Sequence, residues 1–135
     1  MVFQTAVSPL RPANSKIETS LDDLAPHFAR LAANEVPSLI VAVRNTGEFL
    51  QFSGQSGQIQ LDLPLITQEQ QNLEPMLLAA LISRGLEPYV TIGSDGARFL
   101  DADLNGTPDQ IATLVSSVFQ EVFRLQADEI VVLNF

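Results

Sequence analysis

Three short strand-like runs separated by tight turns constrain the fold of this chain more than any other feature. The runs cover residues 37–44, 48–53 and 58–64. The third run alternates apolar and polar residues with a period of two, which is typical of a strand with one buried face. Because only short Gly-containing turns separate the runs, the pattern predicts an antiparallel meander.

Two long helices are predicted after this meander. Thr67 and Gln70 form a capping box, and Gly85 ends the helix after about residue 84. Pro75 interrupts this helix, so we expect a kink or a division there. Residues 107–110 repeat the capping box and open a last helix that is expected to run to about residue 126.

The first helix is less regular. Apolar residues recur at helical spacing between residues 21 and 34, and Ser20 is suited to the N-cap position. Pro26 lies inside this range. It predicts either a kink or a later start of the helix.

The remaining segments complete an α+β domain. Residues 89–92 and 98–100 form a hairpin around Asp95-Gly96, and the chain ends in a segment that reads as a last strand. We predict a mainly antiparallel sheet of five to six strands in the order α-βββ-α-ββ-α, with the helices packed on the sheet. Residues 1–18 are expected to be a flexible N-terminal arm, with a short strand possible at 2–7, and residues 19–135 a single domain.

Composition excludes several classes of function. Seven Lys and Arg against sixteen Asp and Glu give a net charge of −9, so we expect no binding to nucleic acid or to anionic membranes. The chain has no cysteine, and its first residues do not resemble a signal peptide, so we expect a cytoplasmic protein. Charged residues make up only 17% of the chain, which favours a homodimer that buries surplus apolar surface.

Residues 101–109 match the first half of a calcium-binding loop. Asp101, Asp103 and Asn105 occupy positions one, three and five, and Asp109 occupies position nine. Position twelve is Ala112, where such loops need a bidentate acid. The other interpretation of the same residues is a strand, a turn and a capped helix.

Catalytic machinery is hard to assemble from this sequence. His27 is the only histidine, and residues 53–57 lack the spacing of a nucleophile elbow. The carboxylate pairs at 22–23 and 101–103 are expected to be solvated rather than catalytic. We therefore predict no enzyme, no catalytic residue and no cofactor, and keep a small enzyme with dispersed carboxylates as an alternative.

Two stretches carry a resemblance to a known family. Residues 48–54, followed by 58–63, are similar to the "Tyr-Val-Gln-Phe-Ala-Gly" strand of TY-Chap-type domains and its successor, with Phe49 at the tyrosine position. Residues 67–71, followed by 81–86, are similar to the middle helix of that family. With this order of elements, the chain resembles type III secretion chaperones and their YbjN-type and TY-Chap-type relatives over about residues 20–126.

The resemblance implies a dimeric, non-enzymatic domain, chaperone-like or regulatory, that binds a protein or peptide along apolar grooves. The side chains that we expect at such a surface are Phe49, Phe52, Met76, Leu77, Ala80 and Leu81. The stretch 76–82 is apolar almost all round, so it can also be plain core, which is the interpretation we favour for this helix.

Overall fold

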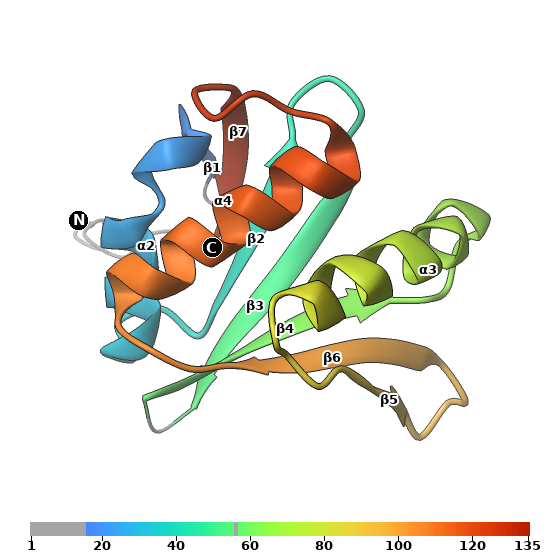
Figure 1. Ribbon diagram of the computed structural model, residues 1–135. Helices are drawn as coiled ribbons and strands as arrows, with labels where there is room; N and C mark the ends of the chain where they lie inside the picture. The colour runs from blue at the N-terminus through green and yellow to red at the C-terminus, as the bar shows by residue number, and fades with distance from the viewer. Residues whose placement is uncertain (1–15, 56) are drawn as a thin grey trace, which may run out of the picture.

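A computed structural model describes residues 16–55 and 57–135. One antiparallel sheet of seven strands carries the helices on one face (Figure 1). The strands are β1 (Lys16–Ser20), β2 (Ser38–Val43), β3 (Phe49–Gln55), β4 (Gln58–Pro64), β5 (Tyr89–Ile92), β6 (Arg98–Leu104) and β7 (Ile130–Asn134). The helical elements are the 3-10 turn η1 (Leu21–Asp23) and the α-helices α2 (Ala25–Ala32), α3 (Gln68–Ser83) and α4 (Pro108–Phe123). The predicted α+β class is confirmed.

The strands lie in the order β1-β7-β2-β3-β4-β6-β5. The predicted meander and hairpin are present, and β6 returns beside β4. The predicted last strand is present as β7, which pairs with β2. The prediction of five to six strands was too low because β1 adds a further strand beside β7. Residues 16–18, which were assigned to a flexible arm, belong to β1, while the strand expected at 2–7 lies outside the described residues.

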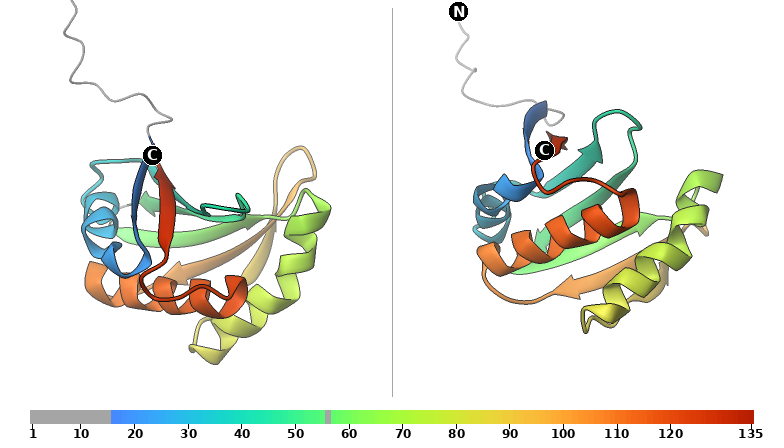
Figure 2. Two further views of the ribbon diagram at one scale, coloured as in Figure 1. Left: turned by 90° about the horizontal axis from the view of Figure 1, so that it is seen from above. Right: turned by 45° about the horizontal axis from the view of Figure 1, so that its top comes forward.

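One face of the sheet and the three helices enclose the core. In β4, Ile59, Leu61 and Leu63 are at most 1% exposed, as the alternation predicted. Helix α4 lies over the middle of the sheet and packs against α2 on one side and α3 on the other (Figures 1 and 2). Phe119 of α4 is fully buried at this junction of layers.

The two predicted capping boxes are confirmed. The Thr67 hydroxyl accepts the Gln70 N–H at 3.1 Å, and the Gln70 amide oxygen accepts the Thr67 N–H at 3.0 Å. Residues 107 and 110 make the same reciprocal pair at the start of α4. α3 continues through Pro75 as one helix. α4 ends earlier than predicted because Arg124 adopts a left-handed φ of 58°.

The single helix expected over residues 21–34 is wrong. η1 and α2 are separate elements. Pro26 lies in the first turn of α2, where a backbone N–H has no partner within the helix, so the N–H that proline lacks costs no hydrogen bond. Ser20 does not cap a helix; its hydroxyl donates to the Asp22 carboxylate instead. Pro26 therefore marks a later start of the helix.

The second face of the sheet, called the open face below, is without helical cover in the described part of the chain (Figure 2). Cross-strand register places Gln51, Asp62 and Asp101 in one row across β3, β4 and β6 on this face. Among the helices of residues 16–55 and 57–135, none combines the length and the apolarity that crossing a bilayer requires.

Candidate functional site

The side chains predicted to bind a partner do not form one surface. Four of them are at most 1% exposed: Phe52, Leu77, Ala80 and Leu81. Phe52, for example, packs edge-on against Phe28 with ring centroids 5.0 Å apart. Of the other two, Met76 is 43% exposed on α3 and Phe49 is half-buried on the open face. The four buried residues are core, so a partner could reach them only by opening the domain.

The predicted calcium ligands are not brought together. β6 continues through Leu104, so Asp101 and Asp103 both point to the open face, whereas Asp109 lies at the start of α4 in the helical layer. The Asn105 side-chain oxygen accepts instead from the Gln58 amide at 3.4 Å. Residues 16–55 and 57–135 contain no group of three or more acidic, histidine or cysteine side chains that could hold a metal. The strand, turn and capped helix explain this segment.

His27 lies on α2 in a partly buried position. Its pKa is lowered, mainly by burial and then by the positive charge of Arg30, while Asp23 acts in the opposite direction. Its ring lies 5.9 Å from the Phe135 ring, and its buried Nδ1 atom has no hydrogen-bond partner in the structure. These surroundings favour the neutral imidazole but do not provide the acid that would orient a catalytic base.

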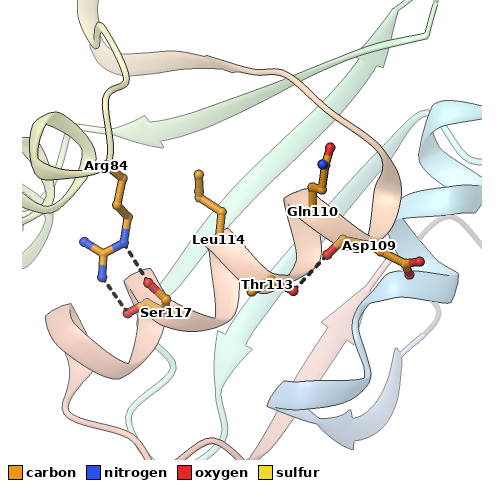
Figure 3. A pocket seen from close by; sticks show the side chains of 6 residues that line it. All are labelled: Arg84, Asp109, Gln110, Thr113, Leu114 and Ser117. Carbon is orange, nitrogen blue, oxygen red and sulfur yellow. Dashed lines mark hydrogen bonds between the residues drawn. The ribbon is translucent and has the colours of Figure 1, made fainter.

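Two hollows flank α4 in the helical layer. The larger, of about 440 Å³, opens between α3 and α4 (Figure 3). The side chains around it are Arg84, Asp109, Gln110, Thr113, Leu114 and Ser117. Arg84 is already bound, since its guanidinium donates to the Ser117 hydroxyl at 2.7 Å and to Glu121 at 2.9 Å. Arg84 therefore joins α3 to α4, while Asp109 lies at the far end of the hollow and points away from it (Figure 3).

The most exposed apolar side chains of a described strand lie on β5. This strand ends the sheet, and all four of its residues are exposed. Val90 is 44% and Ile92 is 71% exposed. Both side chains point to the helical side, because Val90 is paired with the buried Leu100. An exposed edge strand of this kind is a template for pairing with another chain.

Helix α3 adds to this apolar edge. Glu74 forms an ion pair with Arg98 at 3.3 Å, and Arg98 is the cross-strand partner of Ile92, so this side of α3 lies toward β5 and β6. Ile82 is 56% exposed and lies eight residues later, about 80° farther round α3, so it borders that side of the helix. We call Ile82, Val90 and Ile92 the docking edge.

The backbone of β5 has one side that no strand of the described residues pairs with. The Gly93 N–H donates to the Ala97 carbonyl at 2.8 Å. In an antiparallel ladder, hydrogen-bonded pairs alternate with non-bonded pairs. The backbone of Thr91 therefore bonds to β6, whereas the N–H and C=O groups of Val90 and Ile92 point away from β6. These groups are available to an added strand.

Acidic residues surround the docking edge. Glu87 and Asp95 flank β5 in sequence, and Asp103 on the neighbouring strand accepts the Tyr89 hydroxyl at 3.3 Å. The basic residue of this hairpin, Arg98, is already engaged by the ion pair described above. The local field is therefore negative, in line with the net charge of −9.

A carboxyl pair lies on the open face behind this edge. Asp62 of β4 and Asp101 of β6 are direct cross-strand partners, and Asp101 is only 4% exposed. Asp101 Oδ2 accepts the Thr91 hydroxyl at 2.7 Å. The Oδ1 atoms of both carboxyls are buried, and neither has a hydrogen-bond partner among residues 16–55 and 57–135. These two atoms are not open to solvent, although Asp62 also lines a hollow of about 210 Å³ on this face.

The sequence did not predict the pairing of Asp62 with Asp101. The prediction that the 101–103 carboxylates are solvated is wrong for Asp101 and right for the exposed Asp103. The pKa of Asp62 is raised to about 6, first by burial and then by the charge of Asp101. The alternation along β4 and β6 does place Asp62 and Asp101 on the side of each strand that faces away from the core. The register that brings the two residues together is set by contacts between segments distant in sequence.

No protein-family model, no curated protein and no solved structure matches this chain. The functional assignment therefore rests on the geometry described above.

Proposed function

We propose that this protein is a binding domain that takes up an extended segment of a basic partner protein as an additional strand on β5. The observation that carries the proposal is the free edge of β5, where the outward backbone groups of Val90 and Ile92 coincide with exposed apolar side chains. In strand addition, main-chain hydrogen bonds supply affinity and alternate side chains supply specificity.

The two sides of the added strand would meet different chemistry. Side chains on its helical side would contact Ile82, Val90 and Ile92, which are apolar and exposed. Side chains on its other side would lie toward Tyr89 and the acidic open face of β6. A segment that alternates apolar residues with Lys or Arg is complementary to both sides.

Charge also favours a basic partner over a second copy of the chain as the strand that is added to β5. Pairing of two β5 strands would bring together two hairpins that each carry unpaired acids, in a protein of net charge −9. Like charges at an interface oppose association, whereas a basic segment is attracted. The proposal keeps the non-enzymatic binding role that the resemblance to secretion chaperones implies, and it moves the contact from buried α3 residues to the docking edge.

A peptide titration tests the proposal. The probe is a fluorescent synthetic peptide of about nine residues that alternates valine and lysine, and anisotropy reports its binding to the full chain. Val90→Pro removes one amide N–H that faces the free edge and leaves the ladder to β6 intact. We expect it to weaken binding about tenfold or more, with no change of net charge.

Two further variants separate docking from loss of folding. Ile82→Glu removes an apolar side chain of the docking edge. Met76→Glu adds the same charge about 120° round α3 from Ile82 and about 200° from Glu74, the residue that is paired with Arg98 of β6. The first should weaken binding and the second should leave it within about twofold. Equal binding by wild type, Val90→Pro and Ile82→Glu would overturn the proposal, as would a wild type that shows no saturable binding.

A further inference from the structure

The open face holds two buried carboxyl oxygens that lack a hydrogen-bond partner and lie on directly paired residues. They are the Oδ1 atoms of Asp62 and Asp101. Ionised carboxylates only accept hydrogen bonds, so two of them side by side leave both oxygens unsatisfied and repel each other. One proton placed between them turns one carboxyl into a donor and satisfies both atoms.

We propose that Asp62 and Asp101 share one proton, donated by Asp62 to Oδ1 of Asp101, and that this pair is a pH-sensitive latch for strand β5. The assignment of donor and acceptor follows from the remaining bonds. Asp101 is the more buried residue, and its Oδ2 already accepts the Thr91 hydroxyl at 2.7 Å. Asp62 is half-buried, and its cross-strand partner on β3 is Gln51, whose side chain acts to lower the pKa of Asp62.

The environment supports retention of this proton near neutral pH. The titratable groups that face the pair are Asp103 on β6 and Tyr89 on β5. Gln51, the facing residue of β3, and Ile40, its partner on β2, are uncharged. The pKa of Asp62 is raised to about 6 by burial and by the charge of Asp101, and no cation on these strands faces the pair within the described residues. A hollow of about 210 Å³ beside Asp62 gives solvent a route to exchange the proton.

The pair is connected to β5 through side chains. Thr91 donates to Asp101, and Tyr89 is the cross-strand partner of Asp101. Loss of the shared proton would leave two facing anions, push Asp101 away from Asp62 and weaken its hold on Thr91. The latch itself does not depend on ligand binding. The inference that the latch regulates the docking edge rests on the proposed function.

Carboxyl ¹³C NMR of the full chain, without peptide, tests the shared proton. The Asp62 carboxyl carbon should titrate with a midpoint near pH 6, and the Asp101 carbon should shift in the same step because it accepts the shared proton. Asp62→Asn supplies a permanent N–H donor and should abolish the step at Asp101. Asp103→Asn, on the same strand face but outside the pair, should retain it. An Asp62 midpoint below about pH 4.5, close to that of an unperturbed Asp, would overturn the proposal.

Amide hydrogen exchange tests the latch separately. After correction for the intrinsic pH dependence of exchange, protection of the β5 and β6 amides should fall about threefold or more between about pH 5 and pH 7.5 in the wild type. It should stay constant in Asp62→Asn. The same fall in both proteins would refute the latch. Peptide binding is absent from both experiments, so failure of the docking proposal alone would leave their expected results unchanged.

Discussion

Helices α3 and α4 begin alike and are used differently. Each has sixteen residues and opens with a Thr-Gln capping box. Yet α4 buries seven residues and α3 only four, because α4 lies between two helices and α3 has a neighbouring helix on one side only. The number of residues that a helix buries is therefore decided by its position in the helical layer and not by its apolar character. Ile82 of α3 stays exposed, as do Val90 and Ile92 of β5, where we propose docking.

The largest effect should come from truncating the best-packed helix. Phe119 of α4 is fully buried, and Phe119→Ala should lower the free energy of unfolding by about 3–5 kcal/mol. Leu77→Ala, at an equally buried position of α3, should cost about 2–3 kcal/mol, because the outer helix can settle into the cavity. Urea denaturation measures both. An equal or larger cost at Leu77 would break the contrast between the two helices.

A smaller effect should come from the residue that joins the two helices. The Arg84 guanidinium donates to the Ala80 carbonyl, to the Ser117 hydroxyl and carbonyl, and to Glu121. Arg84→Met keeps much of the side-chain volume and should lower the free energy of unfolding by about 2 kcal/mol.

The control for Arg84 is the ion pair on the other side of α3. Both side chains of the Glu74–Arg98 pair are partly exposed, so Glu74→Gln should cost about 0.5 kcal/mol or less. If the two variants had the same stability, Arg84 would not be the main connection between α3 and α4.

Local signals in the sequence predicted the helix starts, and distant contacts decided the rest. The capping boxes at 67–70 and 107–110 need only four neighbouring residues, so they could be identified without the fold. The pairing of β1 with β7 joins opposite ends of the chain, and no local pattern marks it. The candidate site shows the same limit. Asp101 was expected to be solvated, because its burial beside Asp62 arises only when β4 and β6 lie side by side.

Two prolines provide an opposed pair of substitutions. Pro75 lies inside α3 and leaves the Gln71 carbonyl without its usual helical donor, whereas Pro108 is at the first position of α4. Pro75→Ala should raise the free energy of unfolding by about 1–2 kcal/mol, since the gain in helix propensity exceeds the entropy gained by the unfolded chain. Pro108→Ala should lower it by about 0.5–1 kcal/mol. Thermal and urea melts of both variants would show the opposite signs, and equal signs would mean that α3 has adapted to its proline.

The last effect concerns the open face beneath β5 and depends on pH. Burial raises the pKa of Asp62 from the usual 3.8 to about 6. The folded protein therefore binds this proton more tightly than the unfolded chain. The resulting stabilisation is complete below about pH 3.8 and is lost as the pH rises through 6. Asp62→Asn should accordingly raise the free energy of unfolding by about 1 kcal/mol at pH 8, a value reduced from the full shift because the side chain is half-exposed.

At about pH 5 the same substitution should change the stability much less, because the wild type then retains the proton that the amide replaces. Asp103→Asn is the matched control, since Asp103 lies two residues from Asp101 on the same face but is exposed. Its stability relative to the wild type should not change between the two pH values. Urea denaturation of the three proteins at both pH values measures this difference. A pH-independent effect of Asp62→Asn would show that the carboxyl pair does not hold a proton that matters to the fold, and the proposed latch on the outer half of the sheet would then have no source of energy.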